Sequence, residues 1–317
     1  MENNIPLNIV IIILCCGALW KGACWLVEAA ARTAKWLGIS ELVIGLTVVA
    51  FGTSAPEFAA TINAALRDLP GISVGNVVGS NIFNIGFILG GCAIVGVIKT
   101  SRTLVLRDGI LLLVITAALI GFSANGHLGR FEGLAMFVAL IAYLAYLFFK
   151  RQPVLDEELP KGKATWKDGP LLLLGLILII LGGHFLVWSA QAIAQEVGLP
   201  ELVIGLTVVA AGTSVPEFAI SLVAILKKHH SISAGNLIGS NLFNTLGVLG
   251  LAGALRPLAV DASAIKSMIM LIGLTGLVVI FMRTGWRMIR AEGIVLVSVS
   301  LAIWIYIIWM GLNNLTA

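Results

Sequence analysis

Two copies of the pattern Gly-Thr-Ser-x-Pro-Glu hold the residues best suited to chemistry in this sequence. The first copy occupies residues 52–57 and the second occupies residues 212–217, each within a long apolar segment. A carboxylate at such depth in a membrane-length segment is expensive to bury and usually serves a function. A proline kink with a salt-bridged glutamate would explain one copy, but the repetition favours a functional site.

The pattern predicts a helix broken into two halves. Gly52 loosens the first half, and Pro56 removes a backbone donor, although proline is tolerated in the first turn of a helix. A second half-helix should therefore begin near residues 54–56, with a Ser or Thr as its N-cap. Glu57 would lie in its first turn. Broken membrane helices around a polar site are typical of ion-coupled transporters.

A second pattern, Gly-Asn-x-x-Gly-Ser-Asn-x-x-Asn, follows each copy at residues 75–84 and 235–244. Ser80 and Asn84 are four residues apart, as are Ser240 and Asn244, so each pair shares one helical face. The glycines allow close helix packing. Small residues and amides also join membrane helices, and this explains the glycines and some of the asparagines. It does not explain why two such faces accompany two buried glutamates.

Together the two patterns predict a site built entirely of oxygen ligands. Its candidate side chains are Glu57, Glu217, Thr53, Ser54, Thr213, Ser214, Ser80, Ser240, Asn84 and Asn244, joined by the freed backbone carbonyls of Ala50 and Ala210. Hard cations prefer oxygen, and Ca²⁺ takes six to eight such ligands. Two carboxylates balance one divalent cation, and smaller groups of the same oxygens could hold Na⁺. An anionic substrate is disfavoured because the patterns contain no Arg or Lys.

The composition indicates an all-α polytopic membrane protein. Of 317 residues, 59% are apolar and 11% are charged, with a mean hydropathy of +1.04, whereas about a quarter of a soluble protein is charged. About ten segments reach the length that a bilayer requires. We expect spans at 6–31, 41–66, 72–98, 105–123, 131–149, 169–194, 201–226, 232–254, 262–282 and 290–312.

The chain repeats itself at a constant offset of 160 residues. Residues 41–90 align with residues 201–250 without a gap, and about 30 of the 50 positions are identical. We expect a first five-helix repeat at 1–150, a cytoplasmic linker at 151–168 and a second five-helix repeat at 169–317. The linker contains an acidic triplet, Asp156 to Glu158, which we interpret as a solvated segment and not a cation site. Five spans per half invert the second repeat, as in many alternating-access carriers.

The distribution of Lys and Arg predicts the orientation. With the N-terminus outside, fifteen lie on the cytoplasmic side, four lie on the other side, and Lys21 lies within a span. The fifteen are Arg32, Lys35, Lys99, Arg102, Arg107, Lys150, Arg151, Lys161, Lys163, Lys167, Lys227, Lys228, Arg283, Arg287 and Arg290. The four are Arg67, Arg130, Arg256 and Lys266. Both termini should therefore face outward.

The paired patterns and the two-repeat layout resemble the sodium/calcium exchangers of the cation/calcium antiporter superfamily. The resemblance implies that Glu57 and Glu217 are the principal Ca²⁺ ligands, assisted by the hydroxyls and carbonyls named above. One feature departs from some of these exchangers, which have an Asp at one of the last pattern positions. Asn84 and Asn244 occupy both positions here, so the site has one acid fewer.

The resemblance implies exchange of Ca²⁺ for Na⁺ by alternating access, without a cofactor, an obligatory protein partner or a nucleic acid. Exchange of Ca²⁺ or another cation for protons is the alternative, since a desolvated Glu can carry a proton. A cation channel is a third class, and it would conduct without a counter-ion. An enzyme is disfavoured because no nucleophile and base pair occurs in the spans. We expect a multi-pass protein of a prokaryotic plasma membrane.

Overall fold

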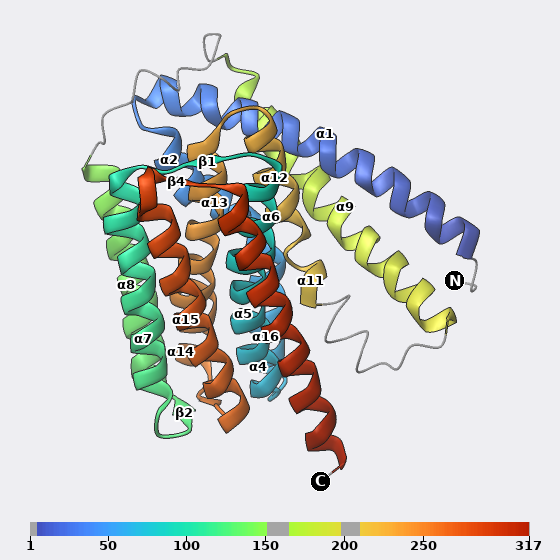
Figure 1. Ribbon diagram of the computed structural model, residues 1–317, viewed down its shortest axis with the longest axis vertical. Coiled ribbons are helices and arrows are strands. Elements are labelled where there is room, and N and C mark those ends of the chain that lie inside the picture. Colours follow the sequence, from blue (N-terminus) through green and yellow to red (C-terminus); the bar gives the residue numbers. More distant parts are fainter. Residues whose placement is uncertain (1–4, 151–164, 198–209, 317) are drawn as a thin grey trace.

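A computed structural model describes residues 5–150, 165–197 and 210–316 of this chain (Figure 1). The first repeat contains α1 (Ile5–Leu37), α2 (Glu41–Ile44), η1 (Gly45–Val49), α3 (Ala50–Thr53), α4 (Ala55–Leu66), α5 (Pro70–Phe83), η2 (Asn84–Ile88), α6 (Leu89–Val95), β1 (Ile98–Lys99), η3 (Leu104–Gly109), α7 (Ile110–Ser123), β2 (His127–Leu128) and α8 (Arg130–Phe149). The second contains α9 (Asp168–Glu196), α11 (Ala210–Gly212), α12 (Val215–Leu226), α13 (His230–Leu242), η6 (Phe243–Leu249), α14 (Gly250–Leu255), β3 (Leu258–Ala259), α15 (Ala262–Arg283), η7 (Thr284–Trp286), β4 (Arg287–Met288) and α16 (Arg290–Thr316).

The fold is a bundle of apolar helices, as the composition predicts. Among the described residues, eight helices are long and apolar enough to cross a membrane, and a bent pair adds a ninth. The predicted total of ten is not confirmed. The predicted seventh span begins among residues 198–209, which lie outside the described residues, and α12 alone is short for a bilayer.

The break at the first Gly-Thr-Ser-x-Pro-Glu pattern lies where the sequence predicts it. Between residues 41–53 and 55–66 the helix bends by 49°. Ser54 is the N-cap residue of α4, and Pro56 lies in the first turn, where its missing N–H leaves no helical bond unmade. The expected side-chain cap is wrong, however, because neither Ser54 nor Ser214 caps its helix with its hydroxyl. Both hydroxyls are directed to the site described below.

Among the described residues, four π-helical segments interrupt the spans, and the sequence did not lead us to expect them. They are η1, η2, η3 and η6. One of them precedes the break, and two begin at or just before Asn84 and Asn244. Short π segments within α-helices occur frequently at functional sites. Here they change which side chains face inward after each motif.

Two small antiparallel sheets show that the halves are arranged as equivalent units. β1 pairs with β4 and β2 pairs with β3. At the offset of 160 residues, β1 corresponds to β3 and β2 to β4, so each pair is the repeat-related copy of the other. Figure 1 places β2 at the opposite end of the bundle from β1 and β4. This exchange of partners across the bundle is what inverted repeats require.

Helices α1 and α9 lie side by side and oblique to the other helices (Figure 1). Glycines allow their close approach: a Cβ on Gly22 would lie 2.8 Å from the Gly175 carbonyl, and the reverse distance is also 2.8 Å. Backbones come this close in membranes where small residues face each other. The two long helices therefore form one packed unit.

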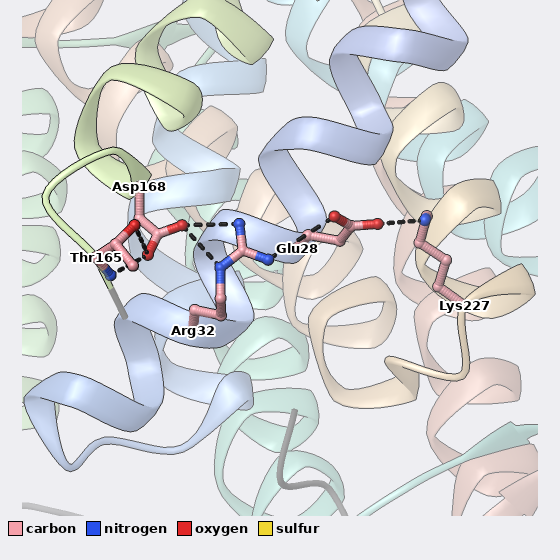
Figure 2. Close-up of polar contacts among 5 residues, drawn as sticks. All are labelled: Glu28, Arg32, Thr165, Asp168 and Lys227. Carbon is pink, nitrogen blue, oxygen red and sulfur yellow. Dashed lines mark hydrogen bonds and ion pairs between the residues drawn. The ribbon is translucent and has the colours of Figure 1, made fainter. Parts of the chain in front are cut away.

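A polar network joins this unit at one end of the bundle (Figure 2). Arg32 of α1 binds Asp168 of α9 at 2.7 Å, and the backbone N–H of Thr165 donates to the same carboxylate at 2.7 Å. Glu28 binds Lys227, the residue that follows α12, at 2.5 Å. The hydrogen bond with Glu28 raises the pKa of the Lys227 ammonium group, so this ion pair persists at neutral pH. The network thus links α1 both to α9 and to the end of α12.

Candidate functional site

Two fully buried glutamates define the site. Glu57 lies in the first turn of α4, and Glu217 occupies the same place in α12. The Ser214 hydroxyl donates to Glu57 Oε1 at 3.3 Å, and the Ser54 hydroxyl donates to Glu217 Oε1 at 3.5 Å. Each carboxylate therefore receives its serine from the opposite repeat.

Two further hydroxyl pairs cross between the repeats. Thr53 Oγ1 lies 3.2 Å from Ser240 Oγ, and Ser80 Oγ lies 3.4 Å from Thr213 Oγ1. These contacts connect each broken span to the following helix of the other repeat. All six hydroxyl residues predicted from the sequence therefore gather around the two glutamates, and only Thr213 is not fully buried.

Asn76 and Asn236 belong to the site but were absent from the predicted set. The amide nitrogen of Asn76 donates to the Glu57 backbone carbonyl, and that of Asn236 donates to the Glu217 carbonyl, each at 3.4 Å. Asn236 Oδ1 also accepts the Thr53 hydroxyl at 3.2 Å. The signal was present in the sequence, because both asparagines precede the motif serine by one helical turn. They brace the first turn that carries each carboxylate.

Asn84 and Asn244 lie one helical turn beyond Ser80 and Ser240, on the same helical faces. Both are fully buried. Asn244 donates its amide nitrogen to Asn81 Oδ1 at 3.2 Å, whereas neither polar atom of the Asn84 side chain has a hydrogen-bond partner among the described residues. No hydrogen bond between these side chains and the glutamates is found in the described part of the chain. Their role as ligands stays a prediction.

The expectation of a freed carbonyl at Ala50 is wrong. This carbonyl accepts the backbone N–H of Ser54 at 3.0 Å and the Thr53 hydroxyl at 3.2 Å. The helix therefore continues its hydrogen bonding up to the break. In the second repeat the N–H of Ser214 bonds to Ala211, one position beyond Ala210. The two breaks therefore differ in their local hydrogen bonding.

The site has acceptors that the protein itself does not satisfy. Glu57 Oε2 and Glu217 Oε2 are buried without a hydrogen-bond partner among the described residues. Neither carboxylate takes part in any ion pair of residues 5–150, 165–197 and 210–316. Buried charges are normally paired or bound to a metal ion. Two such carboxylates amid hydroxyl and amide oxygens can bind a hard cation.

The donor set disfavours other metals. In the described parts of the chain, no three His, Cys, Asp or Glu side chains gather into a cluster. The four cysteines, Cys15, Cys16, Cys24 and Cys92, are free thiols. Zinc and most transition metals prefer nitrogen or sulfur ligands, whereas the hydrogen bonds found to these carboxylates come from serine hydroxyls.

Comparisons with known proteins agree with this geometry. The family model described as "Sodium/calcium exchanger protein" matches residues 7–149 and 170–310. The chain is 33% identical to the sodium/calcium exchanger MaX1 of Methanosarcina acetivorans, over 94% of this chain and 97% of that protein. It is 34% identical to the inner membrane protein YrbG of Escherichia coli, over 75% of this chain and 77% of that protein.

Solved structures extend the likeness to three dimensions. The sodium-calcium exchanger NCX_Mj, soaked with 2.5 mM Na⁺ and 0.1 mM Ca²⁺, superposes with a TM-score of 0.83 at 29% sequence identity. The match covers 93% of this chain and 97% of that one. The likeness therefore includes both halves of the bundle.

Proposed function

This chain belongs to the sodium/calcium exchanger family, and from that premise we propose that it exchanges Ca²⁺ for Na⁺ across a membrane by alternating access. The observation that carries the proposal is the pair of fully buried glutamates, each bonded by a serine of the opposite repeat. Their two charges balance one Ca²⁺. When Ca²⁺ leaves, the carboxylates need other positive charge, and Na⁺ can use the surrounding neutral oxygens as well.

The ligands in this proposal are those expected from the sequence. Glu57 and Glu217 bind Ca²⁺, and the six hydroxyls of Thr53, Ser54, Ser80, Thr213, Ser214 and Ser240 complete the Ca²⁺ and Na⁺ sites. The side-chain oxygens of Asn84 and Asn244 are further candidates. Ala210 stays a candidate through its carbonyl, whereas that of Ala50 already accepts two hydrogen bonds. Charge balance and burial support this set.

The repeat boundaries and the location also belong to the proposal. Residues 1–150 and 169–317 form the two inverted halves, joined by a linker at 151–168, whose residues 151–164 lie outside the described residues. The acidic triplet of the linker, residues 156–158, is among them. We infer a prokaryotic inner membrane with both termini outside, supported by prokaryotic relatives and by the basic-residue count. The substrates are Ca²⁺ and Na⁺, and no cofactor or obligatory protein partner is expected.

Reconstituted proteoliposomes test the exchange directly. Vesicles loaded with Na⁺ should take up ⁴⁵Ca²⁺ when diluted into Na⁺-free buffer, whereas vesicles loaded with K⁺ should not. An imposed pH gradient should drive little uptake. Equal uptake into Na⁺-loaded and K⁺-loaded vesicles, together with acceleration by the pH gradient, would overturn the proposal in favour of proton exchange.

A further inference from the structure

Three side chains form a hydrogen-bonded row between the two repeats. Asn81 of α5 is buried, and its Nδ2 donates to Thr245 Oγ1 of η6 at 2.8 Å. Its Oδ1 accepts from Nδ2 of Asn244 at 3.2 Å. Thr245 and Asn244 belong to the second repeat and Asn81 to the first. The row therefore joins the two repeats through one side-chain amide.

The row ends in an oxygen that has no hydrogen-bond partner among the described residues. The Nδ2 of Asn244 is used in the hydrogen bond to Asn81, so Oδ1 is the outer end of the row. Asn244 Oδ1 is buried without a hydrogen-bond partner among the described residues. Asn244 shares a helical face with Ser240, whose hydroxyl contacts Thr53 at the broken span. A buried acceptor on this face, without a donor, calls for an unseen partner. A transported cation is the partner that the site's chemistry supplies.

The two repeats differ at this row. At the offset of 160 residues, Thr245 corresponds to Ile85, which has no hydroxyl. Asn241, the counterpart of Asn81, donates to the Leu237 carbonyl of its own helix at 2.7 Å and does not reach across. Asn84, the counterpart of Asn244, has no hydrogen bond on either end of its amide among the described residues. Among the described residues, therefore, the last asparagine of the pattern is oriented by a neighbouring amide in the second repeat but not in the first.

We propose that Thr245 is a positioning residue, acting through Asn81 to hold the side-chain oxygen of Asn244 toward the cation. The proposal rests on the proposed exchange function. An amide turned by 180° would present its NH₂ group, which repels a cation. Thr245 holds Asn81 in the row, and in the observed orientation of Asn81 only the nitrogen of Asn244 can donate to Asn81 Oδ1. If the Thr245 hydroxyl donated to Asn81 instead, every amide in the row would be reversed, and the row would end in the NH₂ group of Asn244. A bound cation therefore favours the observed orientation, which ends in an oxygen.

The binding of Na⁺ should depend on the orientation of Asn244 more than the binding of Ca²⁺ does. Ca²⁺ carries twice the charge and draws more of its binding from the two carboxylates, whereas a neutral oxygen contributes a larger share for Na⁺. Removal of the Thr245 hydroxyl leaves Asn81 free to rotate. We therefore expect Thr245→Val to raise the half-saturating Na⁺ concentration about three- to tenfold, the usual range for one hydrogen bond. The half-saturating Ca²⁺ concentration should change less than about twofold by the same reasoning.

The experiment measures Na⁺-driven ⁴⁵Ca²⁺ exchange in proteoliposomes for the wild type, Thr245→Val, Thr245→Ser and Thr245→Ala. Thr245→Ser keeps the hydroxyl and should have the half-saturating Na⁺ concentration of the wild type. Thr245→Ala differs from Thr245→Ser by the hydroxyl alone and should have the raised value. Thr275→Val is the matched control, because Thr275 is also buried but donates only to the Leu271 carbonyl of its own helix at 2.8 Å. Ca²⁺ self-exchange without Na⁺ should change less than about twofold in the Thr245 variants and should be unchanged in Thr275→Val.

A second readout does not need transport. Na⁺ stabilises the folded protein that binds it, so the Na⁺ concentration that raises the melting temperature reports affinity in detergent. The same three- to tenfold shift is expected for Thr245→Val and Thr245→Ala. Wild-type Na⁺ dependence in both variants, or equal impairment in Thr245→Ser, would overturn the inference. If the wild type itself fails to exchange Ca²⁺ for Na⁺, the proposed function has failed instead, and the variants are not at issue.

Discussion

Glu57 and Glu217 place two negative charges in a shell of neutral hydroxyls and amides. Replacing either by Gln keeps the shape and leaves one charge to balance a divalent ion. Loss of one partner from a buried charge pair weakens binding by about 2–5 kcal/mol, or at least about thirtyfold. We therefore expect Glu57→Gln and Glu217→Gln each to reduce Ca²⁺ transport to background, measured as ⁴⁵Ca²⁺ flux in proteoliposomes.

A carboxylate outside the site provides the control for that prediction. Glu132 lies in the first turn of α8, and Glu132→Gln should transport Ca²⁺ at the wild-type rate. Size-exclusion profiles and circular dichroism should show that all three variants are folded. Near-normal flux through a purified variant of Glu57 or Glu217 would remove the observation on which the function rests.

How much of this site the sequence predicted depends on the residue. The glutamates and six hydroxyls were predictable because their motif occurs twice and a broken span brings its residues together. Asn76 and Asn236 have the spacing of the site, but spacing does not reveal that an amide donates to a backbone carbonyl. Thr245 was not predictable, because its partner Asn81 lies on another helix and its repeat counterpart is Ile85.

At the scale of the elements, glycines decide how closely α13 approaches the first broken span. A Cβ on Gly235 would lie 2.9 Å from the Leu42 carbonyl, and a Cβ on Gly239 would lie 2.8 Å from the Ala50 Cβ. These contacts confirm the sequence-based expectation of close packing in the second repeat. The residue that would face Gly75 by the offset of 160 falls among residues 198–209, outside the described residues.

Overpacking at this contact should destabilise the protein. Forcing extra volume into a packed core costs typically about 1–3 kcal/mol, so Gly235→Ala should lower the melting temperature and reduce transport. Gly273→Ala is the control, because a Cβ there meets nothing within 4 Å and alanine favours the helix. Thermal unfolding in detergent compares the two. A Gly235→Ala protein as stable as Gly273→Ala would show that the contact tolerates a methyl group.

The network at the end of α1 makes a prediction of graded stability (Figure 2). The Asp168 side chain is 4% exposed and the Glu28 side chain is 43% exposed. Arg32→Ala leaves Asp168 buried with only Thr165 as a donor and should lower the free energy of unfolding by about 2 kcal/mol. Lys227→Ala removes a more exposed pair, worth about 0.2–1 kcal/mol. The melting temperature should fall further in Arg32→Ala than in Lys227→Ala. A larger fall in Lys227→Ala would contradict this assignment of burial.

The helical patterns were predictable at this scale and the π segments were not. Apolar segments of span length and the break at Pro56 follow from composition and proline chemistry. A π segment shifts backbone hydrogen bonds by one position, and this depends on the neighbouring helices more than on local propensity. The sequence therefore predicted the break and the spans that the described residues show, but not the π segments beside Asn84 and Asn244.

For the whole molecule, the strand pairs agree with the predicted grouping of loops by side. Lys99 of β1 lies opposite Arg287 of β4, and both belong to the basic set assigned to the cytoplasm. His127 and Leu128 of β2 pair with β3 at the other end of the bundle, near loops with few basic residues (Figure 1). These pairs decide which loops share a side. The basic residues then predict which side is cytoplasmic.

The last prediction concerns that orientation. In a background without the four native cysteines, Asn125→Cys should react with an impermeant maleimide added outside intact cells, whereas Asp156→Cys should react only after the membrane is permeabilised. Asn125 is exposed in the loop before β2, on the side with few basic residues, and Asp156 lies in the linker that contains four of the fifteen basic residues. An inverted orientation would place the fifteen basic residues outside, against the bias with which membrane proteins insert. Labelling of Asp156→Cys but not of Asn125→Cys in intact cells would contradict the proposed orientation, and it would leave the site and the pairing of the loops unchanged.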